Sequence, residues 1–281
     1  MMLKRTVLFL VAMALAPNAR AAEPLPIFDA HMHYSAGTWL AYAPAEIFKK
    51  MDAAGVPRAL ISSTPDDGTL RLAEHAPGRV VPFLRPYRRD VRLGNWTTDP
   101  ALMAYVQERL KLGSHLGVGE VHLATAEDAR ATGLRPLLRL LAERGLYLQV
   151  HTDAAPIHAL YEVEPTLKVF LAHAGFTEPA EVVGELMARY PELITELSFR
   201  AHDIMPGASI DSAWRDVLIK YADRIMIGTD TYIADRWAEY EGLVAAHRRW
   251  LEQLPPPTAR AIAYGTAIRL FGGGGGTWPG G

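Results

Sequence analysis

Pro26-Ile27-Phe28-Asp29-Ala30-His31-Met32-His33 is a short apolar run that ends in two histidines one residue apart. The run predicts a β-strand, and on a strand residues i and i+2 point to the same face. His31 and His33 would therefore present their imidazoles side by side, as binding of one metal ion requires. Because a single His-x-His pair occurs by chance in many proteins, its meaning depends on the rest of the chain.

Seven further apolar or β-branched segments follow, and most are separated by one helical segment. They are residues 58–64, 80–86, 117–123, 146–151, 167–173, 193–199 and 224–230. Strands that alternate with helices predict a parallel sheet. Eight such units in roughly 250 residues are typical of a single-domain (β/α)8 barrel of the TIM type.

Amphipathic segments between the strands predict the helices of this fold. The expected helices cover residues 45–54, 101–112, 134–144, 178–190 and 212–221. Residues 235–254 are expected to form one long amphipathic helix, which Pro255-Pro256-Pro257 ends. Residues 258–271 are expected to form a last helix that packs on the barrel.

The positions of polar residues distinguish the barrel from its alternative, a doubly wound open sheet. Polar side chains stand at or near the carboxyl ends of the predicted strands: His31, His33, Glu120, His151, His173, Arg200 and Asp230. In a barrel these ends meet at one mouth, so residues nearly 200 positions apart can share a site. An open sheet would spread them along an edge. The pattern therefore favours the barrel.

Composition argues against several kinds of partner and site. The chain has 281 residues and a net charge of -2, which gives no indication of a nucleic-acid or anionic-membrane partner. A small-molecule substrate is the expected partner, and self-association is left open. Since the chain has no cysteine, disulfides, thiolate ligands and cysteine nucleophiles are excluded. Any metal ion must then be held by histidines and carboxylates.

The N-terminus has the pattern of a secretory signal peptide. Lys4 and Arg5 precede an apolar run over residues 6–16, and Ala19-Arg20-Ala21 follows as an A-x-A cleavage site. The run is shorter than the roughly 20 apolar residues that span a bilayer, so an uncleaved anchor is the less favoured alternative. We expect residues 1–21 to be removed, a periplasmic or secreted barrel over residues 22–271 without membrane attachment, and a flexible glycine-rich tail over residues 272–281.

Six side chains form the predicted chemical site: His31, His33, Glu120, His151, His173 and Asp230. Each one alone could simply hydrogen-bond a loop or cap a turn. Together they would be costly polar groups crowded into one cavity unless they bind a cation. Imidazoles and carboxylates suit Zn²⁺, and also Mn²⁺ or Fe²⁺. The sequence therefore predicts a divalent metal cofactor, with Zn²⁺ ahead of the others.

Several of these segments together carry a family resemblance. The motifs are Asp29-Ala30-His31-Met32-His33, Gly117-Val118-Gly119-Glu120-Val121-His122, Val150-His151, Leu171-Ala172-His173-Ala174-Gly175 and Gly228-Thr229-Asp230. The chain resembles the amidohydrolase superfamily of metal-dependent hydrolases, within the amidohydrolase-2 group, over nearly the whole mature chain. Residues 264–271 are similar to the terminal helix of that family.

The resemblance implies roles for the six residues. It implies that His31, His33 and Asp230 bind one metal ion, and that His151 completes this site in members with one ion. In members with two ions a fourth-strand carboxylate bridges them, and the fifth- and sixth-strand histidines hold the second. Glu120 at that position favours two ions, and the alternative is that it orients a ligand histidine. Asp230 is then the expected general base, while His173 binds the second ion or stabilises an oxyanion.

The expected reaction is hydrolysis of an amide, ester or lactone bond in a small anionic substrate. Candidate substrate-binding residues near the same mouth are Arg85, Arg200, His122 and Tyr232. Two alternatives remain open at this point. One is a mononuclear zinc-dependent decarboxylase of the same group, and the other is a non-catalytic barrel that only binds a metal or ligand.

Overall fold

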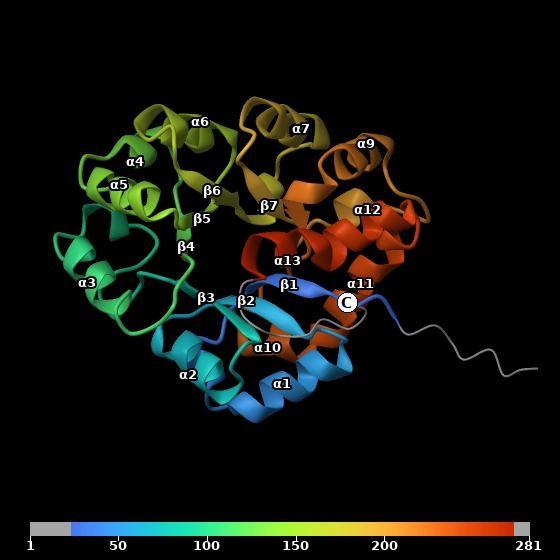
Figure 1. Cartoon of the computed structure of the whole chain (residues 1–281), viewed down its shortest axis with the longest axis horizontal. Coiled ribbons are helices and arrows are strands. Elements are labelled where there is room, and N and C mark those ends of the chain that lie inside the picture. The colour runs from blue at the N-terminus through green and yellow to red at the C-terminus, as the bar shows by residue number, and fades with distance from the viewer. Residues whose placement is uncertain (1–23, 273–281) are drawn as a thin grey trace, which may run out of the picture.

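The computed structural model describes residues 24–272, and one sheet of eight parallel strands forms its centre. The strands follow one another around the sheet in chain order: β1 (Phe28–Met32), β2 (Arg58–Ser62), β3 (Val80–Leu84), β4 (Gly117–His122), β5 (Tyr147–His151), β6 (Lys168–Leu171), β7 (Ile194–Glu196) and β8 (Ile225–Met226). A parallel bridge between Asp29 and Ile227 joins the first strand to the end of the last. The predicted (β/α)8 TIM barrel is thereby confirmed (Figure 1).

Helices surround the strands and connect them. They are α1 (Pro44–Ala53), α2 (Asp67–His75), α3 (Leu102–Arg109), α4 (Ala126–Arg130), α5 (Arg135–Arg144), α6 (Ala154–Val163), α7 (Ala180–Arg189), α8 (Ala201–Ile204), α9 (Ser212–Lys220), α10 (Ala234–Ala238), α11 (Tyr240–Leu251), α12 (Pro256–Arg260) and α13 (Thr266–Phe271). The five helices expected between strands are all present. The sequence did not single out α2 and α6, whose first turns contain the helix-disfavouring Gly68 and Pro156.

The prediction of one long helix over residues 235–254 was wrong. The chain forms α10 and α11, and Glu239 between them has φ −91° and ψ 3°. Two fully buried side chains flank the break and bind different parts of the first strand and its loop. Trp237 donates to the carbonyl of His33, and Tyr240 donates to the carboxylate of Asp29. These tertiary contacts override the helical periodicity of the segment.

The helix predicted over residues 258–271 is present, begins two residues earlier and contains a π-helical turn that the sequence did not indicate. The first part, α12, begins at Pro256, where a proline at the first helical position is well tolerated. A π-helical turn over Ala261–Gly265 follows, and α13 comes after it. The π turn carries the chain from α12 to the bottom of the barrel.

The amino ends of the strands are sealed by α13. Phe271 lies 6.0 Å from Phe28 and 5.7 Å from Tyr147, measured between ring centroids, and both partners begin their strands. Ala267 joins the same apolar cluster, which fills the barrel interior with Phe83 and Phe170. In Figure 1 α13 lies across the strands beside β1. Since this end is closed by apolar side chains, the polar site is restricted to the carboxyl ends.

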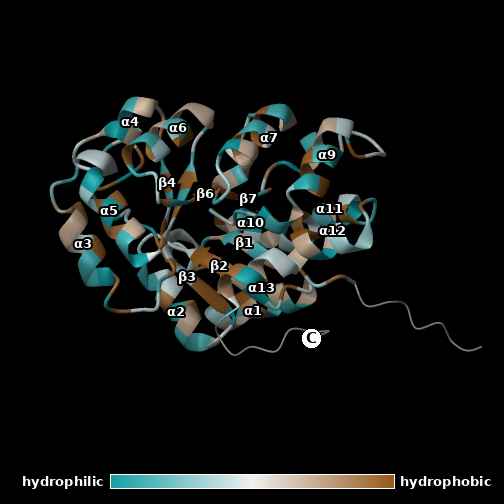
Figure 2. Cartoon of the chain, turned by 45° about the horizontal axis from the view of Figure 1, so that its top comes forward, coloured by the Kyte–Doolittle hydropathy of each residue, from teal (hydrophilic) through white to brown (hydrophobic). Residues whose placement is uncertain are grey.

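The outer layer is amphipathic. In α5, Leu137, Leu138 and Leu141 are buried against the strands, while Arg135 and Arg139 are exposed. Figure 2 shows the same contrast, with hydrophobic strands β2 and β3 inside helices of mixed colour. Within residues 24–272, no helix has the length and apolar character needed to cross a membrane. The predicted signal peptide and most of the predicted flexible tail lie outside the described residues.

Candidate metal centre

His31 in β1 and His33 directly after it each turn one ring nitrogen toward the same point. The Nδ1 atom of His31 lies 2.9 Å from Oε1 of Glu196, and Nδ1 of His33 contacts the carbonyl of Ser62. These acceptors fix the proton on Nδ1 of each ring, so that Nε2 of each is free to bind a metal. The two Nε2 atoms lie 3.1 Å apart in fully buried side chains. His31 and His33 therefore form a preoriented pair of metal ligands.

Asp230 and Glu120 complete a group of four ligand atoms with this pair. Oδ1 of Asp230 lies 3.1 Å from Nε2 of His33 and 3.7 Å from Nε2 of His31. Oε2 of Glu120 lies 3.4 and 3.6 Å from the same two nitrogens. Ligands of a tetrahedral zinc ion at about 2.0–2.1 Å are separated by roughly 3.3–3.4 Å. The four atoms thus have the spacing that such an ion requires.

One atom of this group is otherwise without a partner. Oδ1 of Asp230 is buried and accepts no hydrogen bond from any residue in the described range 24–272. Burying an unsatisfied carboxylate oxygen is costly. A metal ion between the four atoms removes this cost, so the residues present fit the cofactor that the sequence predicts.

A second group of ligand atoms adjoins the first. Oε1 of Glu120, Nδ1 of His151 and Nε2 of His173 are separated from one another by 3.0–3.1 Å. Glu120 belongs to both groups, because its Oε2 atom faces the first and its Oε1 atom faces the second. A carboxylate in this position can bridge two metal ions. The structure therefore brings together all six residues predicted as metal ligands.

The charges around these atoms favour a bound cation. Glu120, Asp230 and Glu196 are three carboxylates with almost no exposed surface. Burial would lower the pKa of His31, yet Asp230, Glu120 and Glu196 raise it well above its ordinary value. Burial would likewise raise the pKa of Glu120, but His31 and the other histidines hold it well below its usual range. Of the lysines and arginines in residues 24–272, only Arg85 pairs with one of these carboxylates, at 3.0 Å from Glu120.

Two of the ligands sit on strained backbone. His173 has φ 55° and Asp230 has φ 50°, in the left-handed region that non-glycine residues rarely occupy. Hydrogen bonds hold both conformations. The N–H of His173 donates to Glu196 at 2.7 Å, and Arg236 donates to the carbonyl of Asp230 at 2.6 Å. Such strain accumulates where a site requires a particular side-chain direction.

Glu196 is the main site residue that the sequence analysis missed. It accepts hydrogen bonds from Nδ1 of His31 and from the backbone N–H groups of His173 and Ser198. Burial would raise its pKa, but His31 and His173 lower that pKa to about 2, so it stays ionised. The available signal was a lone carboxylate inside the apolar run 193–199, where a buried charge needs partners.

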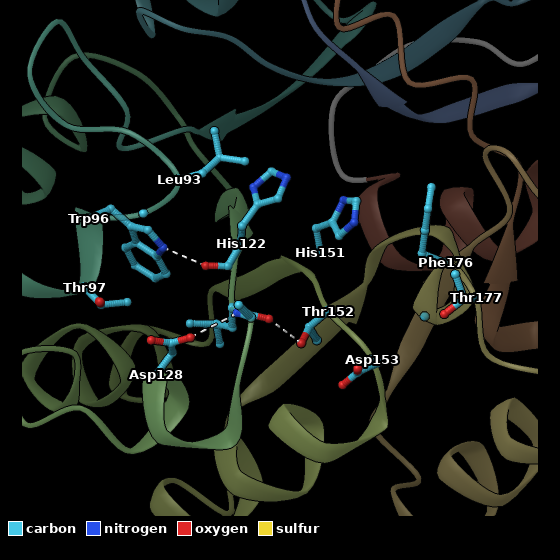
Figure 3. Close-up of a pocket in the computed structure, with 14 residues that line it drawn as sticks. Leu93, Trp96, Thr97, His122, Asp128, His151, Thr152, Asp153, Phe176 and Thr177 are labelled. Atoms are coloured by element: carbon cyan, nitrogen blue, oxygen red, sulfur yellow. Dashed lines mark hydrogen bonds between the residues drawn. The ribbon is translucent and has the colours of Figure 1, made fainter.

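A cavity of about 630 Å³ opens beside the second ligand group (Figure 3). Its lining includes His122, His151, Phe176, Trp96 and Asp153. The His122 ring stacks on His151 with centroids 4.6 Å apart, and its Nδ1 atom lies 3.0 Å from the hydroxyl of Tyr87. Burial lowers the pKa of His122 to about 3, so the ring is neutral at physiological pH.

The remaining predicted substrate residues have different positions. Arg85 is held against Glu120 by two hydrogen bonds, from Nε to its carbonyl and from Nη2 to its carboxylate. Arg200 is 2% exposed and donates to the carbonyls of Phe176 and Glu178, so it supports the loop after β6. Tyr232 is half exposed at the rim, with its ring 6.4 Å from that of Phe199.

Comparisons with known proteins agree with this geometry. A family model described as Amidohydrolase matches residues 28–273. Among proteins of curated function, none matches the chain.

Solved structures share the fold. An amidohydrolase from Burkholderia multivorans is 17% identical, with a TM-score of 0.60 over 88% of this chain and 99% of its own. A putative 2-pyrone-4,6-dicarboxylic acid hydrolase from Pseudomonas putida is 21% identical, with a TM-score of 0.55 over 88% and 98%. A TatD homologue from Escherichia coli is 16% identical, with a TM-score of 0.61 over 88% and 98%.

Proposed function

This chain belongs to the amidohydrolase family of metal-dependent hydrolases, and on that premise we propose that it is a binuclear enzyme that hydrolyses an amide, ester or lactone bond in a small anionic substrate. The observation that carries the proposal is the position of Glu120. Its two carboxylate oxygens face two separate groups of ligand atoms, with Oε2 beside His33 and Oε1 beside His151 and His173. An orienting role for Glu120 would require only one of these contacts.

Divalent ions held by these residues would lower the pKa of a bound water to around 7 and would polarise the substrate carbonyl. Zn²⁺ suits the nitrogen and oxygen donors present. The chain supplies the remaining chemistry. Burial opposes ionisation of Asp230, but His31 and His33 hold its pKa well below the ordinary value, so it is ionised at neutral pH. Asp230 therefore accepts a proton from the attacking water and passes it to the leaving group.

The neighbouring residues keep this machinery in position. Glu196 fixes the proton on Nδ1 of His31, and the carbonyl of Ser62 does so for His33. Ser198 lies 2.6 Å from Nδ1 of His173 and does the same for that ring. His173 belongs to the second ligand group, so it supports binding of the second ion rather than an oxyanion.

The proposed substrate class rests on chemistry and on likeness. Arginines lie on the β3–α3 loop next to the centre, and two structures with this fold are described as hydrolases of a dicarboxylic acid.

We also propose, from the N-terminal pattern, that the enzyme is exported to the periplasm or secreted after removal of residues 1–21. Determining the N-terminal residue of the protein recovered outside the cytoplasm tests this location.

Metal content per chain, measured on protein purified without added metal, tests the centre. We expect near two equivalents in the wild type and near one in Glu120→Gln, which cannot bridge with a carboxylate. A panel of amides, esters and lactones, each with and without a carboxylate, then tests the reaction. One equivalent in both proteins, together with release of CO₂ from a carboxylate substrate, would replace this proposal with the mononuclear decarboxylase. Bound metal without turnover on either kind of substrate would instead support a non-catalytic barrel.

A further inference from the structure

A second cavity, of about 660 Å³, opens at the barrel mouth beside the loops that follow β1, β2 and β3. Its lining includes Thr64, Tyr87 and four arginines of the β3–α3 loop. These arginines are Arg85, Arg88, Arg89 and Arg92, and among residues 24–272 no acidic side chain lines the cavity with them. We call this space the arginine cavity.

The arginine cavity adjoins the metal centre. Arg85 lines it and also lies 3.0 Å from the bridging carboxylate of Glu120. Tyr87 lines it too, and its hydroxyl contacts His122, which lines the cavity beside His151. Leu93 lines both cavities, and in Figure 3 it stands beside His122. Arg85, Tyr87 and Leu93 thus place the arginine cavity next to the metal centre and the first cavity.

The four arginines differ in their partners. Arg85 is bound to Glu120, and Arg88 pairs with Asp99 at 2.5 Å. Arg89 and Arg92 are exposed, and neither side chain forms an ion pair or hydrogen bond with any residue of the described range. Asp90 lies between them in sequence but lines a neighbouring cavity instead. Two arginines are thus free to bind an anion in a space that no carboxylate of the described range lines.

The loop that carries them is anchored at both ends. Arg88 and Val91 exchange two backbone hydrogen bonds of 3.0 Å, which closes a tight turn around Arg89. Val91 is buried, and the fully buried Trp96 donates from its ring nitrogen to the carbonyl of His122 at 2.7 Å. An anchored loop loses less conformational entropy when a ligand binds than a free one.

We propose that Arg89 and Arg92 bind an oxyanion group of the substrate, either a carboxylate or a phosphate, in the arginine cavity while the scissile bond lies at the metal centre. This assignment rests on the proposed hydrolytic function and extends it. The sequence predicted Arg200 as an anion-binding residue, but Arg200 supports the loop after β6. The proposal assigns that role to Arg89 and Arg92 instead. A guanidinium presents paired donors that match the two oxygens of a carboxylate or phosphate.

Titration calorimetry of succinate and inorganic phosphate, carried out separately, tests the assignment on three proteins: the wild type, Arg89→Gln/Arg92→Gln and Arg135→Gln/Arg139→Gln. The last removes the same charge from exposed positions on α5. The titrations are repeated after removal of metal by dialysis against a chelator, so that binding to an ion is distinguished from binding to arginine. Succinate and phosphate tell which oxyanion the cavity prefers.

We expect at least one anion to bind the wild type with and without metal, and to bind Arg89→Gln/Arg92→Gln at least about tenfold more weakly. The α5 double variant should stay within about twofold of the wild type. Equal affinities in all three proteins, an equal loss in both double variants, or no binding to the wild type would overturn the assignment. Because binding is measured without turnover, failure of the proposed hydrolysis would show separately, in the substrate panel.

Discussion

The imidazoles of His31 and His33 are each held by a hydrogen bond on the side away from the metal centre. For His31 the partner is the carboxylate of Glu196, which lies 2.9 Å from Nδ1 and also accepts the N–H of His173. Such partners fix the tautomer and direction of a ligand histidine and increase its basicity. Glu196 thereby links a residue of the first ligand group to one of the second.

We predict that Glu196→Gln weakens metal binding or lowers kcat/KM by about 10–100-fold, because the amide is a neutral and weaker acceptor. The measurements are metal affinity by competition with a chelator and the rate on the substrate found in the panel. Glu143→Gln, at an exposed position on α5, is the matched control. Wild-type metal affinity and rate in Glu196→Gln would contradict the positioning role.

For Asp230→Asn we expect a folded barrel with kcat lowered by about 10²–10⁴-fold, since an amide cannot accept the proton. Circular dichroism checks the fold, and metal content separates loss of the base from loss of the ion. Normal turnover in this variant would refute the role of Asp230 as general base.

The helix α13 closes the amino ends of the strands. Phe271 is 3% exposed and packs against Phe28, Phe83 and Tyr147, each from a different strand. A π-helical turn over Ala261–Gly265 joins it to α12. The helix thus stabilises the strands whose far ends carry the ligands.

We predict that Phe271→Ala lowers the free energy of unfolding by about 3–5 kcal/mol, because it leaves a cavity in a tightly packed interior. Urea denaturation of the metal-loaded protein measures this change. Leu112→Ala, at a side chain 58% exposed, should cost less than about 1 kcal/mol. A similar small cost for both variants would mean that α13 does not close the barrel in solution.

Across the whole molecule, the metal centre joins strands from opposite parts of the chain. Its candidate ligands lie on or just after β1, β4, β5, β6 and β8, and three buried carboxylates belong to the centre: Glu120 and Asp230 among the ligands and Glu196 beside them. An ion bound only by the folded chain therefore stabilises the entire barrel.

Removal of metal by a chelator is expected to lower the Tm. An ion present at 100 times its Kd contributes about 2.7 kcal/mol, which corresponds to roughly 5–10 °C for a chain of this size. Differential scanning calorimetry with and without chelator measures the shift. His31→Ala/His33→Ala should contain less metal and respond less to the chelator. Unchanged metal content in that variant would contradict the assignment of the centre.

Stability should also depend on pH through His247, a fully buried core residue whose Nε2 atom contacts the carbonyl of Gly228. Burial lowers the pKa of His247 to about 4, against about 6.5 in an unfolded chain. Between these values the unfolded state binds more protons, so this contribution is complete above pH 6.5 and is lost as the pH falls toward 4. The loss amounts to about 3 kcal/mol.

Burial raises the pKa of Asp29 to about 6. Its contribution to stability is therefore lost as the pH rises, the opposite of the pH dependence expected for His247. The test is therefore the difference in unfolding free energy between the wild type and His247→Gln, measured at pH 7 and at pH 4. We expect the advantage of the wild type to shrink by about 3 kcal/mol at the lower pH. An advantage that does not change with pH would contradict the neutral, buried state of His247.

The sequence by itself determined the barrel and the six candidate metal ligands that the fold brings together. Apolar runs and the alternation of side chains along a strand are local patterns, so the strands can be predicted from short segments. In a barrel the carboxyl ends of parallel strands meet at one mouth, which predicts that His31 and Asp230 lie close together. The break between α10 and α11 could not be predicted in this way, because Trp237 and Tyr240 bend the chain to reach partners about 200 residues away.

Only the tertiary structure decided which charged residues serve the ligands and which are free. Arg85, Arg200 and Glu196 are each polar residues near a strand end in the sequence, yet one pairs with Glu120, one supports a loop and one orients His31. Within the part of the chain that the structure describes, the side chains of Arg89 and Arg92 have no ion-pair or hydrogen-bond partner, and they line a cavity that the sequence does not reveal. A side chain's role depends on the partners within about 3 Å of its polar atoms, and those partners come from distant segments that meet only in the folded chain.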